Sequence, residues 1–132
     1  ILASILKESN ALIGAESKDF HSNCRVTKSD VLVFEADESD GSFVDSNPYC
    51  AIVTNAEPEH MEFYNYDYQL FYKHYSDFIN KAQKKVLCKD DKFLESQKGD
   101  KISINDISEI RYRVIDNLPK TTFRFLGEEF EV

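Results

Sequence analysis

The chain has 132 residues, of which 42% are hydrophobic and 13% aromatic, and its formal net charge is −8 at pH 7. This length and composition allow one folded domain with a core, which excludes a disordered segment and leaves no length for a second domain. The acidic balance argues against nucleic acid as a partner, because neutralising phosphates requires a basic surface.

The sequence shows neither a membrane span nor a secretory leader. No apolar run approaches the roughly 18 residues that a membrane-spanning helix needs. The first residues, ILASILKES, lack the basic leader and the cleavage pattern of a signal peptide. Cys24, Cys50 and Cys88 lie far apart, which is typical of free thiols in a reducing compartment. We therefore predict a cytoplasmic protein without a membrane partner.

Both ends of the chain resemble cut elements. The sequence does not begin with Met, and Ile1, Leu2, Ile5 and Leu6 share one helical face with no N-cap before them. This pattern indicates the back half of a helix, and the last residues stop within a strand-like run. We therefore expect a fragment of a longer protein.

The next segments predict strands separated by loops. Residues 10–15 form a short apolar run that fits a strand, and the polar residues 15–29 are typical of a loop. Residues 31–34 are a continuous apolar run, as expected for a strand buried on both faces. Residues 49–54 predict a second buried strand, and Pro58 ends it in a loop.

The clearest helix is predicted between Tyr66 and about Gln83. Its apolar residues recur at steps of three and four, with Lys and Asp between them. That spacing favours a helix that packs on a sheet over an aromatic surface that stacks a ligand. The stripe consists of Tyr68, Phe71, Tyr72, Tyr75, Phe78, Ile79 and Ala82.

The C-terminal third predicts more strands and one helical turn. A third strand is expected within residues 84–91, and a helical turn over 91–97. Residues 110–116 and 121–132 favour antiparallel strands, with a turn at Gly127. The whole order predicts an α/β fold with a mainly parallel central sheet flanked by helices and an antiparallel β appendage.

Unusual polar residues follow the two predicted buried strands. Ligands of open α/β sheets bind beyond the carboxyl ends of the strands. If the two strands are neighbours, Glu35 and His60 can converge on one crevice, where a carboxylate and an imidazole suit a divalent cation. Taken singly, the acidic residues are more typical of a solvated loop, His60 of the surface, and Asn55 of a turn.

Two sequence strings together resemble the central domain of the Mur ligases. They are EADESDGSF, residues 35–43, and AIVTNAEPEH, residues 51–60. Both strings stand in the family's order at a fitting separation, and the resemblance is clear from Asn23 to Ala82 and looser beyond. EADESD followed by Gly-Ser-Phe points to the alanine-adding member. The resemblance implies a P-loop-type α/β domain.

The resemblance implies an ATP-dependent amide ligase of peptidoglycan synthesis. ATP would phosphorylate the carboxylate of UDP-N-acetylmuramate, and the amine of L-alanine would attack the acyl phosphate. Mg²⁺ would offset the repulsion between the two anions that meet. Two alternatives stay open: a related ligase that recycles muropeptides, and a non-catalytic module that binds a metal or a nucleotide.

The family pattern also implies roles for individual residues. Glu35 is expected to hold Mg²⁺, and His60 to ligate a second Mg²⁺ or lie beside it, so these two are the predicted catalytic and metal residues. Asn55 is expected near the sugar and the phosphates of the substrates. Glu59 is a mild departure, since many members have Asp there. The other predicted substrate-binding residues are Asp37, Glu38, Ser39, Asp40, Asn23 and Arg25.

One family motif is absent from the chain. The pattern G-x-x-x-x-G-K-[ST], which would hold the phosphates of ATP, does not occur among the 132 residues. In the family this loop immediately precedes a helix like ILASILKES. We therefore expect that residues 1–132 are a partial central, ATP-binding domain that lacks the upstream loop and both flanking domains, and that the chain alone is inactive.

Overall fold

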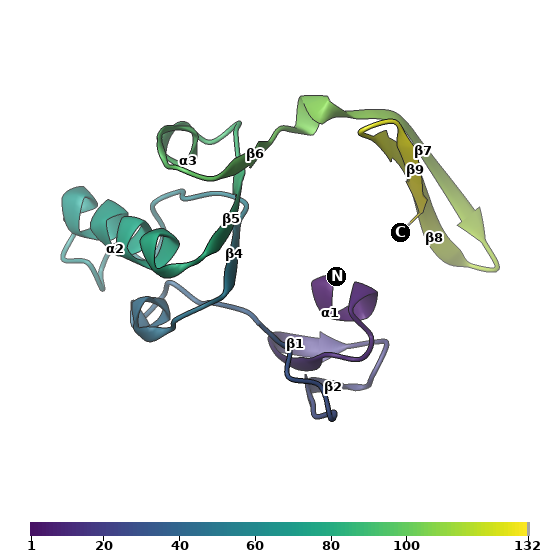
Figure 1. Ribbon diagram of the computed structural model, residues 1–132, viewed down its shortest axis with the longest axis horizontal. Coiled ribbons are helices and arrows are strands. Elements are labelled where there is room, and N and C mark those ends of the chain that lie inside the picture. Colours follow the sequence, from purple (N-terminus) through teal and green to yellow (C-terminus); the bar gives the residue numbers. More distant parts are fainter. Residues whose placement is uncertain (132) are drawn as a thin grey trace. The chain divides into compact units, whose positions relative to one another are not determined.

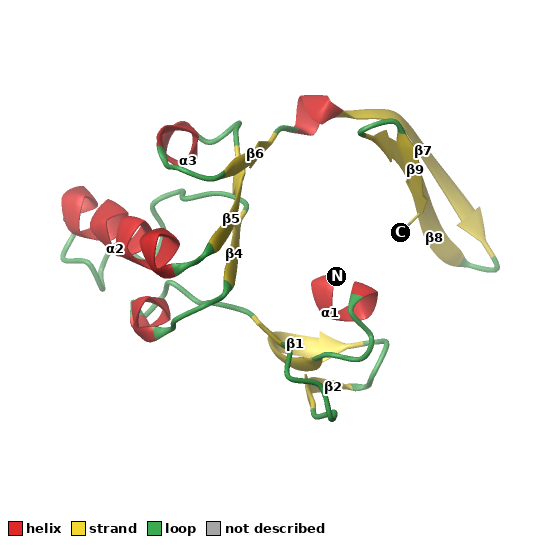
Figure 2. Cartoon of the chain, in the orientation of Figure 1, coloured by secondary structure: helices red, strands yellow, loops and turns green. Residues whose placement is uncertain are grey.

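The computed structural model describes residues 1–131 (Figures 1 and 2). The chain divides into two compact units. The first unit is residues 1–38, and the second begins at Ser39. The first unit contains α1 (Leu2–Ile5), β1 (Asn10–Ser17), β2 (Ser22–Arg25) and β3 (Leu32–Phe34). The second contains η1 (Ser42–Asp45), β4 (Cys50–Val53), α2 (Tyr68–Lys81), β5 (Lys84–Cys88), α3 (Lys92–Ser96), β6 (Asp100–Ile102), η2 (Ile104–Asp106), β7 (Ile107–Ile115), β8 (Leu118–Phe125) and β9 (Glu128–Glu131).

The first unit is a three-stranded sheet in the order β2-β1-β3. Strand β1 runs parallel to β3, with Ala11 opposite Val33, and antiparallel to β2. The prediction of a loop over residues 15–29 was wrong, because the end of β1 and all of β2 lie within it. Polar side chains do not prevent strand pairing at a sheet edge, since the backbone supplies the hydrogen bonds and the side chains stay in water.

The prediction that the strand at residues 31–34 is buried on both faces was also wrong. Val31 is 51% exposed and Leu32 is 55% exposed. Strand β3 pairs with β1 on one side, and β4 pairs with β5 in a different sheet. The two predicted strands are therefore not hydrogen-bonded neighbours. Apolar composition shows that a strand prefers burial, but the covering elements decide whether it is buried.

The second unit contains the parallel sheet that the sequence predicts. Its order is β4-β5-β6, with Val53 opposite Leu87 and Leu87 opposite Lys101. Helices α2 and α3 lie on one side of this sheet (Figures 1 and 2). Burial alternates along β4: Ala51 and Val53 are buried, whereas Ile52 is 52% exposed. The second predicted buried strand is thus buried on one face only.

Helix α2 confirms the aromatic stripe as core. The Asp67 side chain accepts hydrogen bonds from the first-turn amides of Gln69 and Leu70, which fixes the start of the helix. One member of the stripe, Tyr68, is 58% exposed because it lies at the first helical position. The buried members are Phe71, Tyr75, Phe78, Ile79 and, just after the helix, Ala82.

The DGSF part of the first motif is a packing element of the second unit. Phe43 in η1 is buried, and its ring centroid lies 5.3 Å from those of both Tyr75 and Phe78. Gly41 has φ +68°, and a Cβ there would lie 2.5 Å from the Phe63 ring. Only glycine satisfies both conditions without strain. Gly41 therefore allows the chain to turn so that Phe43 reaches α2.

The C-terminal strands form the antiparallel appendage that the sequence predicts. The order is β7-β8-β9, with antiparallel pairing throughout and a turn at Gly127, which has φ +84°. The short strand β6 has no apolar pattern that predicts it from the sequence. Among the described residues, no helix is long and apolar enough to cross a membrane. The three cysteines are free.

Candidate functional site

The second motif string places its polar residues at the carboxyl end of β4. Asn55 is the second residue after the strand and is exposed, whereas the next residue, Ala56, is only 2% exposed. The Ala56 amide donates a 2.9 Å hydrogen bond to a carboxylate oxygen of Asp91, which lies after β5. The loop between β4 and α2, residues 54–67, is therefore attached to the body of the sheet at its first turn.

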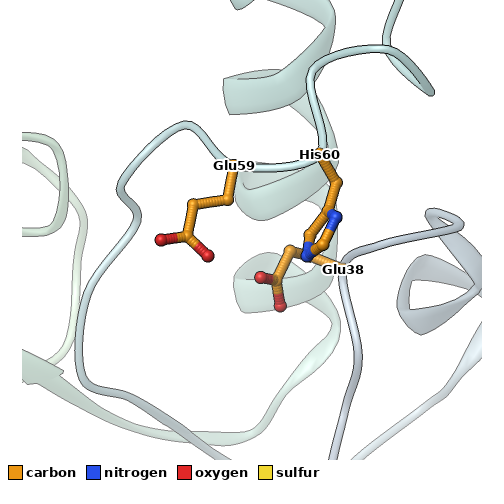
Figure 3. A group of neighbouring side chains, drawn as sticks. All are labelled: Glu38, Glu59 and His60. Atoms are coloured by element: carbon orange, nitrogen blue, oxygen red, sulfur yellow. The ribbon is translucent and has the colours of Figure 1, made fainter.

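Glu59 and His60 follow in the same loop (Figure 3). A carboxylate oxygen of Glu59 and a ring nitrogen of His60 lie within 4.8 Å of each other, and both residues are exposed. The Nδ1 atom of His60 also lies 3.9 Å from a carboxylate oxygen of Glu62. His60 has φ +51°, a left-handed conformation that costs a non-glycine residue about 1–2 kcal/mol.

Glu35 is held by the strand next to its own. It follows β3 directly, its amide donates to the carbonyl of Leu12, and its Oε2 accepts a 2.8 Å hydrogen bond from the Gly14 amide. A Cβ on residue 14 would lie 3.3 Å from this Oε2, so glycine lets the carboxylate approach the backbone closely. Glu35 is exposed, and its carboxylate takes the place of a strand partner where the β1–β3 ladder ends.

The rest of the acidic string spans the boundary between the units. Asp37 is exposed and Glu38, also drawn in Figure 3, is the last residue of the first unit. Ser39 and Asp40 begin the second unit, where Asp40 accepts a 2.9 Å hydrogen bond from the Ser42 amide. Asp40 thereby supports the turn that leads into η1. The substrate-binding roles expected for these four residues stay predictions.

Asn23 and Arg25 lie in β2 rather than in a loop. Asn23 is exposed, whereas the Arg25 guanidinium donates to the carbonyl oxygens of Ala3, Leu6 and Ser9 at 2.8–2.9 Å. Arg25 thus binds the carbonyl end of α1, where a cation is favoured. The structure gives Arg25 a structural role within the first unit, and its predicted contact with substrate stays a prediction.

The donor set fits a hard divalent cation. Carboxylate oxygens such as those of Glu35 and Glu59 are the ligands that Mg²⁺ prefers, whereas the imidazole of His60 suits Mn²⁺ or a metal-bound water better. A carboxylate offers about four lone-pair sites, so one hydrogen bond from Gly14 leaves Glu35 able to bind a cation. Glu35 belongs to the first unit and His60 to the second. Their predicted convergence on one ion stays a prediction.

Sequence reasoning missed the residues that hold the site residues in place. Gly14 and Asp91 support Glu35 and the β4–α2 loop through single hydrogen bonds. The signal for Asp91 was present in the sequence, because an Asp that precedes a short helix is a typical N-cap. Its second bond, to Ala56, spans 35 positions along the chain and leaves no local pattern.

Comparison with solved structures identifies the fold. The crystal structure of UDP-N-acetylmuramate–alanine ligase from Thermotoga maritima matches 99% of this chain with a TM-score of 0.78, at 17% sequence identity. The match covers 32% of that ligase. The chain therefore has the fold of one segment of a Mur ligase, and the predicted α/β fold is confirmed.

Sequence comparison adds the enzymes that the chain resembles over this segment. The chain is 49% identical to UDP-N-acetylmuramate–L-alanine ligase of Campylobacter curvus over an alignment of 136 positions, which covers 99% of the chain and 31% of the relative. It is 48% identical to the ligase of the same name from Helicobacter pylori strain P12, over 93% of the chain. Over the segment that it covers, the chain is a homologue of UDP-N-acetylmuramate–L-alanine ligases. It spans about 30% of the length of these relatives, and no family model matches it.

Proposed function

We propose that this chain is part of a ligase that joins L-alanine to UDP-N-acetylmuramate in the cytoplasm, with ATP as co-substrate and Mg²⁺ as cofactor. The single observation that supports this proposal best is the 49% identity to a curated ligase over 99% of the chain. The acidic and histidine residues at the strand ends are consistent with it. The product would enter peptidoglycan synthesis, on which cell shape and division depend.

We further propose that residues 1–132 are a partial central, ATP-binding domain of that ligase. The chain contains no Gly-Lys-Thr phosphate loop, whose amides and lysine would hold the phosphates of ATP. The complete protein would add this loop and the two flanking domains. The isolated chain is therefore expected to be inactive, and L-alanine-dependent phosphate release by the purified 132-residue chain would contradict this part of the proposal.

The proposed chemistry assigns separate tasks to the two motif strings. Bound Mg²⁺ would offset the negative charge of the phosphates and of the substrate carboxylate. Glu35, oriented by the Gly14 amide, would hold that cation. Glu59 and His60 would present a carboxylate and an imidazole to a second cation or its water. Asn55, at the carboxyl end of β4, would donate to the sugar or the phosphates.

A metal titration of the full-length ligase tests this assignment. The His60→Gln variant and the parent enzyme are titrated with Mg²⁺ and with Mn²⁺ in the presence of nucleotide, while turnover is followed. A ligating imidazole must be neutral, so protons compete with the metal, metal affinity should fall at lower pH, and the variant should flatten that dependence. A larger loss for Mn²⁺ than for Mg²⁺ supports direct ligation, because Mn²⁺ accepts nitrogen more readily.

The same experiment also has an outcome for an indirect role and for no role. If His60 holds a metal-bound water, the variant should lose turnover with little change in metal affinity. If affinity and turnover are both unchanged by His60→Gln, His60 has no part in the reaction and the proposed site is wrong.

A further inference from the structure

Two adjacent carboxylates connect the carboxyl ends of all three strands in the parallel sheet of the second unit. Asp90 and Asp91 follow β5, the central strand of the order β4-β5-β6. Asp91 accepts the Ala56 amide from the segment after β4. Asp90 accepts the Ser103 hydroxyl and the Ile104 amide, both at 2.7 Å, from the segment after β6. Each carboxylate thus accepts hydrogen bonds from the segment that follows one of the two neighbouring strands.

The hydrogen bond that the Ala56 amide donates to Asp91 joins two groups whose positions are fixed independently of each other. One oxygen accepts the Leu94 amide at 2.8 Å and caps α3, whose Leu94 is fully buried. The other oxygen accepts the amide of Ala56, which is 2% exposed. Without Asp91 this amide would be a buried donor without its carboxylate acceptor, which is unfavourable. The segment after β4 is therefore held against a side chain that a capped helix keeps rigid.

Asn55 is the residue on which this bond acts most directly. It is bonded covalently to Ala56, so the position of the Ala56 amide fixes where Asn55 leaves the sheet. The far end of the same loop is anchored separately, because Met61 and Tyr64 are 9% and 0% exposed. His60 lies close to that far anchor, whereas Asn55 lies close to Asp91.

We infer that Asp91 is a positioning residue that holds Asn55, and with it the first turn of the β4–α2 loop, in place to bind substrate. This inference rests on the proposed function, since it assumes that Asn55 contacts substrate. Asp91 acts through the backbone of Ala56 and touches no reacting atom. Asp90 makes the equivalent attachment on the β6 side, where no candidate site residue lies, so it provides a matched control.

The test compares Asp91→Asn with Asp90→Asn in the full-length ligase. At position 91 both partners are backbone amides, so the NH₂ group of an asparagine cannot replace the lost acceptor oxygen. At position 90 one partner is the Ser103 hydroxyl, which can accept from that NH₂ group. Asp91→Asn should speed hydrogen exchange of the Ala56 amide and lower kcat/KM by about 10- to 100-fold. Asp90→Asn should leave exchange of the Ala56 amide unchanged and kcat/KM within about twofold.

A double-mutant cycle with Asn55→Ala separates positioning from general destabilisation. If Asp91 acts through Asn55, Asp91→Asn should cost less than about threefold in the Asn55→Ala background, because the two changes remove one interaction. Equal losses for Asp91→Asn and Asp90→Asn, or full additivity with Asn55→Ala, overturn the inference. Should Asp91→Asn fail to fold, Asp91→Ser keeps a capping oxygen on a shorter side chain and is measured in the same way.

Different results would contradict the positioning role of Asp91 and the proposed function. If Asn55→Ala impairs the ligase and Asp91→Asn does not, the positioning role is wrong and the proposed function stands. If Asn55→Ala leaves turnover unchanged, Asn55 is not a substrate ligand, and the proposed assignment fails together with the positioning role. Exchange at Ala56 then shows only whether the hydrogen bond exists.

Discussion

Replacing Phe78 with Ala should lower the free energy of unfolding by about 3–5 kcal/mol, as is usual for emptying a buried aromatic site. Phe78 is 7% exposed, and its ring centroid lies 5.3 Å from that of Phe43. Burial of such a side chain is worth about 1.5–3 kcal/mol. A tilted ring pair adds about 0.5–1.5 kcal/mol. The cavity that remains accounts for the rest.

The matched control for this variant lies on the same helix. Tyr68 belongs to the same sequence stripe but is 58% exposed, so Tyr68→Ala should cost less than about 1 kcal/mol. Both variants are compared with the parent chain by urea unfolding at 25 °C, followed by far-UV circular dichroism. Similar losses for the two variants, or a Phe78→Ala variant that unfolds like the parent, would refute the assignment of this stripe to the core.

Three further predictions follow from individual residues. Gly41→Ala should lower the free energy of unfolding by more than about 2 kcal/mol, because the left-handed backbone and the Phe63 ring both oppose a Cβ. Gly127→Ala, which has open space around it, should cost about half as much in the same urea assay. Hydrogen bonds from the Ile104 amide and the Ser103 hydroxyl hold the pKa of Asp90 below its usual value. The stability that this carboxylate contributes is therefore present above the unfolded pKa of about 3.9 and is lost as the pH falls through the lower folded pKa. Asp90→Asn should accordingly flatten the decline of Tm below about pH 4. In the full-length ligase, Glu35→Ala should raise the activation free energy by several kcal/mol, and so lower turnover sharply, with little loss of stability. Near-normal turnover at saturating Mg²⁺ would contradict a metal-binding role.

The sequence alone determined the elements whose patterns are local. The three- and four-residue spacing of apolar side chains predicted α2 and its buried face, because that period is a property of the helix itself. The glycine at residue 127, between two strands with alternating side chains, predicted the hairpin, because this pattern is also local. The motif strings at residues 35–43 and 51–60 were enough to indicate the family, which the sequence relatives then supported.

Only the tertiary structure decided the features that depend on partners distant in sequence. An apolar run such as residues 31–34 does not state which strand pairs with it, and β3 pairs with β1 rather than with β4. A polar segment likewise does not reveal β2, whose Arg25 binds the end of α1 across 19–22 positions. The carboxylate of Asp91 reaches Ala56 across 35 positions. Such contacts arise when the chain folds and brings a donor to an acceptor, and no local period in the sequence records them.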